Sequence, residues 1–184
     1  MFQDLFGKQP LIVSLNINSE TDHKIAQLTE AGLTAIELLD CSPTYMAHLR
    51  SLYPDLKIGM GGILTVDDLE MAHQLHADFI TTPGFLPSIC KTASLYNMRL
   101  ITGVASIGEA MQAQELGFLD VRPCPGDIHL CRQLSHFMPE MKLYPSNIQW
   151  DLIEQFLDLP SVAAVGLSNP DPLQMLQISE SLHI

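Results

Sequence analysis

The chain has 184 residues, of which 47% are hydrophobic and 16% charged, the proportions of a compact globular protein. It carries 9 Lys and Arg against 21 Asp and Glu, a net charge of −12. Nucleic acids and anionic membranes both need clustered cations, so this balance argues against either as a partner. We see no secretory signal and no apolar run near the ~18 residues of a membrane helix, and we expect a cytoplasmic protein with reduced thiols.

Short apolar runs of β-forming residues recur along the chain, with amphipathic helical stretches between them. In chain order the runs cover residues 11–17, 34–39, 56–62, 78–84, 99–105, 118–123, 141–146 and 162–168. They begin at intervals of about 20 residues, the spacing that βα units with short loops produce. No linker or break in composition separates the units, so we predict one domain over residues 1–184.

The helical stretches begin with polar residues that cap helices. The clearest three cover residues 19–32, 65–77 and 106–117. Thr65 is followed three residues later by Asp68, and Ser106 by Glu109, which is the spacing of a capping box. Each stretch therefore predicts a helix that follows one of the apolar runs.

Eight such units favour a compact (β/α)8 TIM barrel of the α/β class. The chain is shorter than the roughly 250 residues typical of that fold, which requires short loops. An open, doubly wound sheet remains the alternative. In both architectures the functional residues belong at the C-terminal ends of the strands.

Two charged residues stand out in the predicted strands. Glu37 interrupts the apolar run 34–39; an inward-facing carboxylate there would lose hydration, and we expect its pKa to rise toward that of a general base. The alternatives are that Glu37 pairs with a buried cation or points outward between the helices. Arg122, near the end of the run 118–123, offers a fixed charge and a planar fork for a carboxylate or phosphate. The alternative role for Arg122 is a structural pair with Glu37.

The other strand ends are rich in Gly, Ser and Asn. The candidate anion-binding residues among them are Gly61, Gly62, Pro83, Gly84, Asn147, Gly166 and Ser168. After the last two runs, Ser and Asn are expected where helices begin, which suits either a bound anion or ordinary helix capping. Cys41 and Cys124 are expected near the same mouth, where no histidine is available to activate a thiol. No set of metal ligands is recognised, and we expect neither a metal nor a cofactor.

Three segments make the chain similar to the family of 2-keto-3-deoxy-6-phosphogluconate (KDPG) and 4-hydroxy-2-oxoglutarate aldolases. They are "AGLTAIELL", "KIGMGGILTVDDLEMAHQLHADFITTPGF" and "LITGVASIGEAMQAQELG". The resemblance implies a (β/α)8 barrel, a homotrimer, and aldol cleavage that yields pyruvate through a Schiff base on a lysine of the sixth strand. It places Glu37 on the general base of the family and Arg122 on that lysine.

Several positions depart from the family pattern. Besides Arg122 in place of the lysine, Cys41 matches a substrate-binding arginine and Gly62 a threonine. The phosphate-loop segments are altered as well, at residues 145–148 and 166–168. Four residues of the family pattern are retained, namely Glu37, Pro83, Gly84 and Ser168.

We therefore predict a carbon–carbon lyase homologue that binds a small keto acid or phosphorylated keto acid without a Schiff base. In an active enzyme Glu37 would be the base and Arg122 the clamp for an enolate. The alternative is a non-catalytic sensor or a structural subunit of a trimer. A metal-dependent aldolase is disfavoured, because no two strand ends supply a set of His and carboxylate ligands.

Overall fold

The structure is a computed structural model that describes residues 10–182. Its strands are β1 (Leu11–Asn16), β2 (Ala35–Leu39), β3 (Lys57–Gly61), β4 (Phe79–Thr81), β5 (Leu100–Val104), β6 (Asp120–Pro123), β7 (Lys142–Leu143) and β8 (Val165–Ser168). Its helices are α1 (Thr21–Glu30), α2 (Pro43–Leu52), α3 (Val66–Gln74), α4 (Pro87–Leu95), α5 (Ile107–Glu115), α6 (Ile128–Phe137), the 3₁₀ turn η1 (Trp150–Leu152), α7 (Ile153–Leu157) and α8 (Pro172–Leu182). Within residues 10–182, none of the helices has the length and apolar character needed to cross a membrane.

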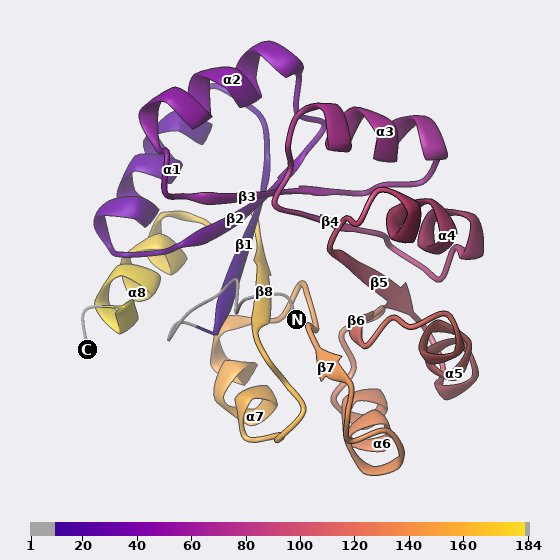
Figure 1. Ribbon diagram of the computed structural model, residues 1–184. Coiled ribbons are helices and arrows are strands. Elements are labelled where there is room, and N and C mark those ends of the chain that lie inside the picture. Colours follow the sequence, from indigo (N-terminus) through magenta and orange to yellow (C-terminus); the bar gives the residue numbers. More distant parts are fainter. Residues whose placement is uncertain (1–9, 183–184) are drawn as a thin grey trace.

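The eight strands form one parallel sheet in the order β7-β6-β5-β4-β3-β2-β1-β8. Its two edges meet, because Leu143 forms a parallel bridge with Val162 just before β8. The amide of Leu143 donates to the carbonyl of Ser161 at 2.8 Å, and the amide of Ala163 donates to the carbonyl of Leu143 at 2.9 Å. Figure 1 shows the strands in the middle with the helices around them. The predicted (β/α)8 barrel is confirmed, and the open doubly wound sheet is wrong.

The capping pairs behave as predicted at one helix and differ at another. At α3, Thr65 and Asp68 form a complete capping box. At α5, the Ser106 hydroxyl accepts from the amide of Glu109 at 3.2 Å, but the Glu109 carboxylate accepts from Ala105, one residue before the cap. Both arrangements satisfy amides that would otherwise be unpaired at a helix start.

Strand β7 is much shorter than the run 141–146 from which it was predicted. Only Lys142 and Leu143 are strand residues. Pro145 has no amide hydrogen and cannot continue the ladder as a donor. Its carbonyl still accepts from the amide of Gly166 at 2.7 Å, so the segment stays beside β8.

Two separate hydrophobic cores stabilise the barrel. The larger one lies between the strands and the helices and contains, among others, Ile25, Leu49, Leu69 and Leu134. The smaller one consists of alternate strand positions and their continuations, Ile12, Ala35, Phe79, Ile101, Tyr144 and Ala164. Because side chains alternate across a strand, this second set faces the inside of the barrel. It forms an apolar layer beneath the candidate site.

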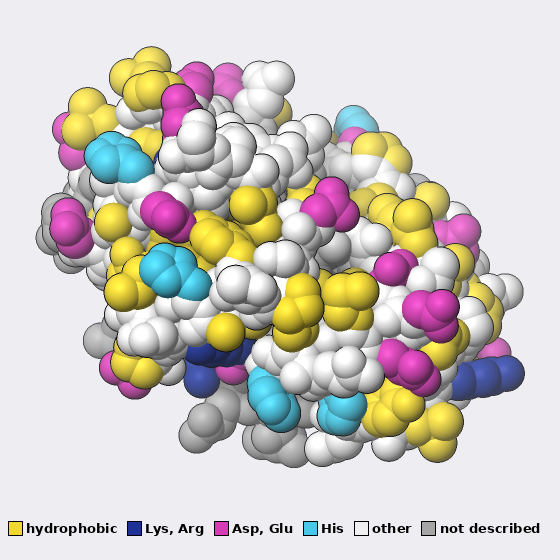
Figure 2. Space-filling model, turned by 90° about the horizontal axis from the view of Figure 1, so that it is seen from above, with side chains coloured by type: hydrophobic (Ala, Val, Ile, Leu, Met, Phe, Trp, Pro, Cys, Tyr) yellow, Lys and Arg dark blue, Asp and Glu magenta, His cyan; other side chains and the backbone are white. Residues whose placement is uncertain are grey.

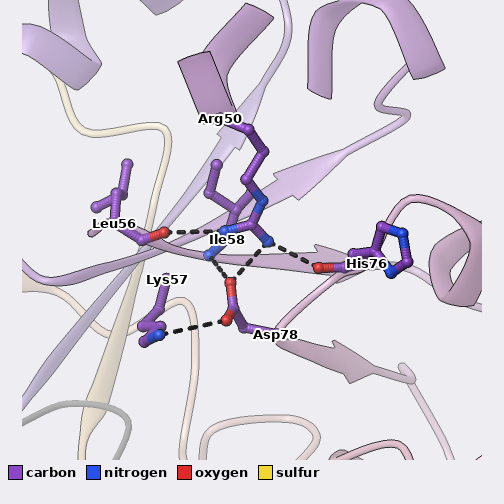
Figure 3. Close-up of polar contacts among 6 residues, drawn as sticks. All are labelled: Arg50, Leu56, Lys57, Ile58, His76 and Asp78. Atoms are coloured by element: carbon purple, nitrogen blue, oxygen red, sulfur yellow. Dashed lines mark hydrogen bonds and ion pairs between the residues drawn. The ribbon is translucent and has the colours of Figure 1, made fainter. Parts of the chain in front are cut away.

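At the N-terminal end of β3 and β4, the Asp78 carboxylate organises a polar network (Figure 3). It accepts from Arg50 Nη2 at 2.7 Å and from the amide of Ile58 at 2.8 Å. Arg50 also donates to the carbonyls of Leu56 at 3.1 Å and His76 at 2.8 Å. The network joins the end of α2 to the starts of two strands, at the end of the barrel opposite the candidate site.

Candidate functional site

Four polar side chains occupy the layer of the barrel interior next to the apolar one. Ser14, Glu37 and Thr81 lie two residues beyond Ile12, Ala35 and Phe79 on β1, β2 and β4. Two-residue steps keep side chains on the same face of a strand, so all three point inward. Arg122 reaches the same layer from β6. The layer is close to the C-terminal ends of the strands, where the sequence predicted the site.

The Glu37 carboxylate accepts hydrogen bonds from all three of its neighbours in this layer. Arg122 Nη1 donates to Oε1 at 3.0 Å, and Arg122 Nη2 donates to Oε2 at 2.9 Å, which is a bidentate ion pair. The Ser14 hydroxyl donates to Oε2 at 2.6 Å, and the Thr81 hydroxyl donates to Oε1. A carboxylate has about four acceptor positions. The four contacts therefore use the whole capacity of Glu37.

Arg122 is nearly as deeply buried as its partner. The exposed fraction of the side chain is 9% for Arg122 and 1% for Glu37. Nη1 of Arg122 also donates to the Thr81 hydroxyl at 3.2 Å, whereas Nε is buried without a hydrogen-bond partner among residues 10–182. The structural pair, which the sequence left as the alternative role for both residues, is formed in this structure.

The expectation that the pKa of Glu37 would rise is wrong. Burial is the largest influence on this pKa and does raise it, but the charge of Arg122 and the hydrogen bonds from Arg122, Ser14 and Thr81 together lower it below its ordinary value of 4.5. Glu37 is thus held as a carboxylate. The sequence argument considered burial alone, and a buried cation reverses the sign.

Two adjacent glycines shape the interior beside Glu37. A Cβ atom on Gly61 would lie 2.2 Å from Oε1 of Glu37, so no larger residue fits against the carboxylate. Gly62 has a φ of 74°, a conformation that disfavours residues with side chains. The two glycines therefore let β3 approach the carboxylate closely and then turn away toward α3.

Pro83 and Gly84 follow β4 and pack on the neighbouring strand. A Cβ atom on Gly103 of β5 would lie 2.4 Å from the amide nitrogen of Gly84 and 2.5 Å from the carbonyl carbon of Pro83. The amide of Gly103 donates to the Thr82 hydroxyl at 3.0 Å. Gly103 thus allows the Pro83–Gly84 turn to lie against the barrel wall.

Asn147 lies in the loop after β7, and Gly166 and Ser168 belong to the neighbouring strand β8. Gly166 lies against Ser146, since a Cβ atom there would be 2.9 Å from Ser146 Cα. Asn147 is exposed and has a φ of 59°, and Ser168 is exposed at the end of β8. Within residues 10–182, the hydrogen bonds and ion pair of Glu37 and Arg122 involve only each other, Ser14 and Thr81, and none of these three residues.

The prediction that Ser and Asn begin the two following helices is wrong. The 3₁₀ turn η1 begins after Gln149, without a side-chain cap. At α8 the capping residue is Asp171, whose carboxylate accepts from the amide of Gln174 at 2.8 Å. Asn169 instead accepts from the amide of Asn16 at 2.6 Å and so ties β8 to β1.

The two cysteines near the mouth are held as thiols. Burial raises the pKa of Cys124, which is half-buried two residues beyond Arg122, although the charge of Arg122 opposes this effect. Burial also raises the pKa of Cys41, which lines a cavity of about 460 Å³ between the loops after β2 and β3. Among residues 10–182 no group of three potential metal-ligating side chains occurs.

Ser14 and Thr81 were missed as candidate site residues. Both lie in predicted apolar runs, and both are buried. The signal that could have found them is alternation, because a polar residue two positions beyond an inward-facing apolar residue must also face inward. The pairing of Ser14 with Glu37 in the register of β1 and β2 agrees with this argument.

Comparison with known proteins shows the family to which this barrel belongs. The sequence profile described as "Aldolase: KDPG and KHG aldolase" matches residues 5–183. The chain belongs to this family. The resemblance drawn from the sequence segments is thereby confirmed.

Individual relatives agree with this assignment. The 2-dehydro-3-deoxy-phosphogluconate aldolase of Haemophilus influenzae is 28% identical over 162 residues, which are 85% of this chain and 72% of the relative. The KHG/KDPG aldolase of Escherichia coli is 20% identical over 92% of this chain and 84% of its own length. Among solved structures, the KDPG aldolase of Legionella pneumophila, described with pyruvate captured as a covalent carbinolamine, superimposes with a TM-score of 0.84. That match covers 97% of this chain and 94% of the other at 24% identity, and it shows the fold.

Proposed function

We propose that this member of the aldolase family binds a small keto acid or phosphorylated keto acid and forms no Schiff base with it. The observation that carries the proposal is the Arg122–Glu37 ion pair inside the barrel. The family resemblance puts Arg122 at the position of the Schiff-base lysine. Imine formation requires a neutral primary amine that attacks a ketone, and a guanidinium group, which stays protonated, cannot supply one.

The lysines of the described chain offer no substitute. Lys57 and Lys142 are the exposed first residues of β3 and β7, at the end of the barrel opposite the candidate site. Lys24 lies on α1, where its ammonium donates to the carbonyl of Pro170 at 2.9 Å, and Lys91 lies on α4. Lys8 is outside the described residues.

In this proposal Arg122 supplies the positive charge for the anionic ligand. The rim residues that would surround the ligand are Gly61, Gly62, Pro83, Gly84, Asn147, Gly166 and Ser168. Their location is what supports this assignment. They lie in or just after the C-terminal parts of β3, β4, β7 and β8, where barrels of this type carry their ligand sites. We assign no cofactor to the site.

A second candidate function is a non-catalytic sensor or a structural subunit of a trimer. It is favoured by the state of Glu37, whose four acceptor positions are used and whose pKa is lowered mainly by Arg122 against the effect of burial. A carboxylate held in this way is a weak proton acceptor. Aldol cleavage of several keto acids by the wild type, compared with Glu37→Gln, separates the two functions, because only an enzyme shows turnover that this substitution abolishes.

We further propose a homotrimer in the cytoplasm without a nucleic-acid partner. One structural neighbour of this chain is a cage designed by fusing symmetric oligomeric domains, with a TM-score of 0.82. On the face that carries α2, Lys and Arg side chains are visible only in the lower part, while acidic side chains are scattered over it (Figure 2). Such a surface repels a polyanion.

The proposal is tested by trapping with pyruvate and borohydride, followed by intact-mass analysis. The wild-type chain should keep its unmodified mass, because none of the lysines in residues 10–182 lies in the barrel interior. The Legionella pneumophila aldolase, described with pyruvate bound covalently, is the positive control. Ligand-observed NMR with the same pyruvate solution should still detect binding to the unmodified chain. A reduced adduct on any lysine, or the absence of binding, would contradict the proposal.

A further inference from the structure

The terminal fork of Arg122 is already occupied by a carboxylate. Nη1 donates to Glu37 Oε1 at 3.0 Å and to the Thr81 hydroxyl at 3.2 Å, and Nη2 donates to Glu37 Oε2 at 2.9 Å. This two-point geometry is the one in which guanidinium groups bind carboxylate ligands most specifically. Glu37 therefore takes the place that the carboxylate of a keto acid would take.

The other edge of the guanidinium is not open to a ligand in this arrangement. It contains Nε, which is buried without exposed surface and has no partner among residues 10–182. Only 9% of the Arg122 side chain is exposed. A ligand that arrives from the mouth can gain two-point binding on the terminal nitrogens only if Glu37 leaves them.

A Glu37 side chain released from Arg122 would be a buried charge without a counter-ion. The groups that face it are Ser14 from β1, Gly61 from β3, Thr81 from β4, Arg122 from β6, and Cys124 just after β6. Arg122 is the cation among these groups, and the Cys124 thiol is neutral. Burial of an unpaired carboxylate is costly, and such a group takes up a proton instead.

We propose that a carboxylate ligand binds Arg122 by replacing the Glu37 side chain, and that Glu37 takes up one proton from solvent in the exchange. The inference rests on the proposed function, which supplies the ligand class. The charges balance, since the ligand adds one negative charge and the proton one positive charge. Arg122 keeps one carboxylate partner, and the protonated Glu37 is left beside the bound ligand with an O–H that can donate to it.

This exchange makes the Arg122 fork selective for a monoanionic group, such as the carboxylate of a keto acid. A monocarboxylate such as pyruvate restores the original balance of one cation and one anion in the interior. Inorganic phosphate, which is largely a dianion at pH 8, would leave one negative charge uncompensated in a buried layer at that pH. Pyruvate should therefore bind more tightly than phosphate.

The test is titration calorimetry with pyruvate in two buffers that differ in their ionisation enthalpy. The difference between the observed heats should correspond to the uptake of about one proton per pyruvate, and the dissociation constant should increase by up to about tenfold per pH unit between about pH 6 and pH 8. The Glu37→Gln chain should bind pyruvate without proton uptake, with little dependence on pH, and more tightly than the wild type at the upper end of this range. At pH 8, phosphate should bind more weakly than pyruvate to the wild type.

Each other outcome has a definite meaning. Pyruvate binding without proton uptake, with equal affinity in both chains, overturns the exchange but leaves the proposed ligand class standing. No binding by either chain overturns both, and tighter binding of phosphate overturns the selectivity that the exchange requires. If Glu37→Gln does not fold, the heats of pyruvate binding to the wild type in the two buffers still show whether a proton is taken up, and so test the exchange.

Discussion

Glu37 and Arg122 depend on each other for their burial inside the barrel. Each is more than nine-tenths buried, and each supplies the other's counter-charge in a bidentate contact. Ser14 and Thr81 complete the acceptor positions of the carboxylate. Such a group of residues behaves as a unit, since removal of one charge leaves the other buried and unpaired.

The first prediction concerns this mutual dependence. Arg122→Met and Glu37→Leu should each lower the free energy of unfolding by about 3–5 kcal/mol, because each leaves one uncompensated buried charge. The double variant should lose clearly less than the sum of the two, since no buried charge remains. Urea denaturation of the four chains measures the coupling. Additivity to within about 0.5 kcal/mol would contradict the prediction.

The second prediction concerns pH. The pKa of Glu37 is lowered in the folded chain below its ordinary value of 4.5, because Arg122 and the hydrogen bonds to the carboxylate outweigh burial. Its stabilising contribution is therefore fully present above that ordinary value and is lost as the pH falls through the folded pKa. The stability difference between wild type and Glu37→Gln should shrink as the pH falls below about 4.5 and stay constant from pH 5 to pH 7. A difference that instead grew on acidification would mean that the folded pKa is raised.

At the scale of the elements, local patterns predicted the helices and strands well where the signal lay within a few residues. The capping pair Thr65 and Asp68 forms the expected box at the start of α3. The run 141–146 yielded only a two-residue strand, since Pro145 cannot extend the ladder as a donor. The Asp78 network escaped prediction altogether, because Arg50 and Asp78 are 28 positions apart and only the folded barrel brings them together.

The third prediction belongs to this network. Asp78→Ala should lower the free energy of unfolding by about 1–3 kcal/mol, because the amide of Ile58 and the guanidinium of Arg50 both lose their acceptor. Lys57→Ala is the matched control. Lys57 lies 3.6 Å from Asp78 with 49% of its side chain exposed, and it should contribute about 0–1 kcal/mol. Thermal or urea denaturation measures the free energy of unfolding of both variants. An equal loss in Asp78→Ala and Lys57→Ala would contradict the prediction, because it would mean that the ion pair alone, and not the hydrogen bonds, stabilises this part of the barrel.

At the scale of the whole molecule, the regular alternation of strands and helices was sufficient to predict a closed barrel. The positions of Glu37 within β2 and of Arg122 near the end of β6 were predicted too. The contact between them was left as one of two alternatives. These residues are 85 positions apart, and the stagger of a closed barrel decides which inward side chains meet. Local patterns carry no information about that stagger. The same limit explains why Ser14 and Thr81 were overlooked.

The fourth prediction concerns assembly. We expect light scattering coupled to size exclusion to give three times the mass of the chain, in agreement with the homotrimer that the family resemblance implies. The measured mass should not change over a tenfold range of protein concentration, as for a stable assembly. A monomer at all concentrations would contradict the proposed trimer.

We propose that this chain has lost the imine chemistry because position 122 carries an arginine, while the barrel around that position is kept. Trapping with pyruvate and borohydride on wild type, Arg122→Lys and Arg50→Lys tests it most directly. Arg122→Lys places a primary amine beside Glu37, whereas Arg50→Lys adds a lysine at the opposite end of the barrel as a control. We expect a reduced adduct at position 122 of Arg122→Lys and none on the other two chains. An adduct on the wild-type chain would contradict it.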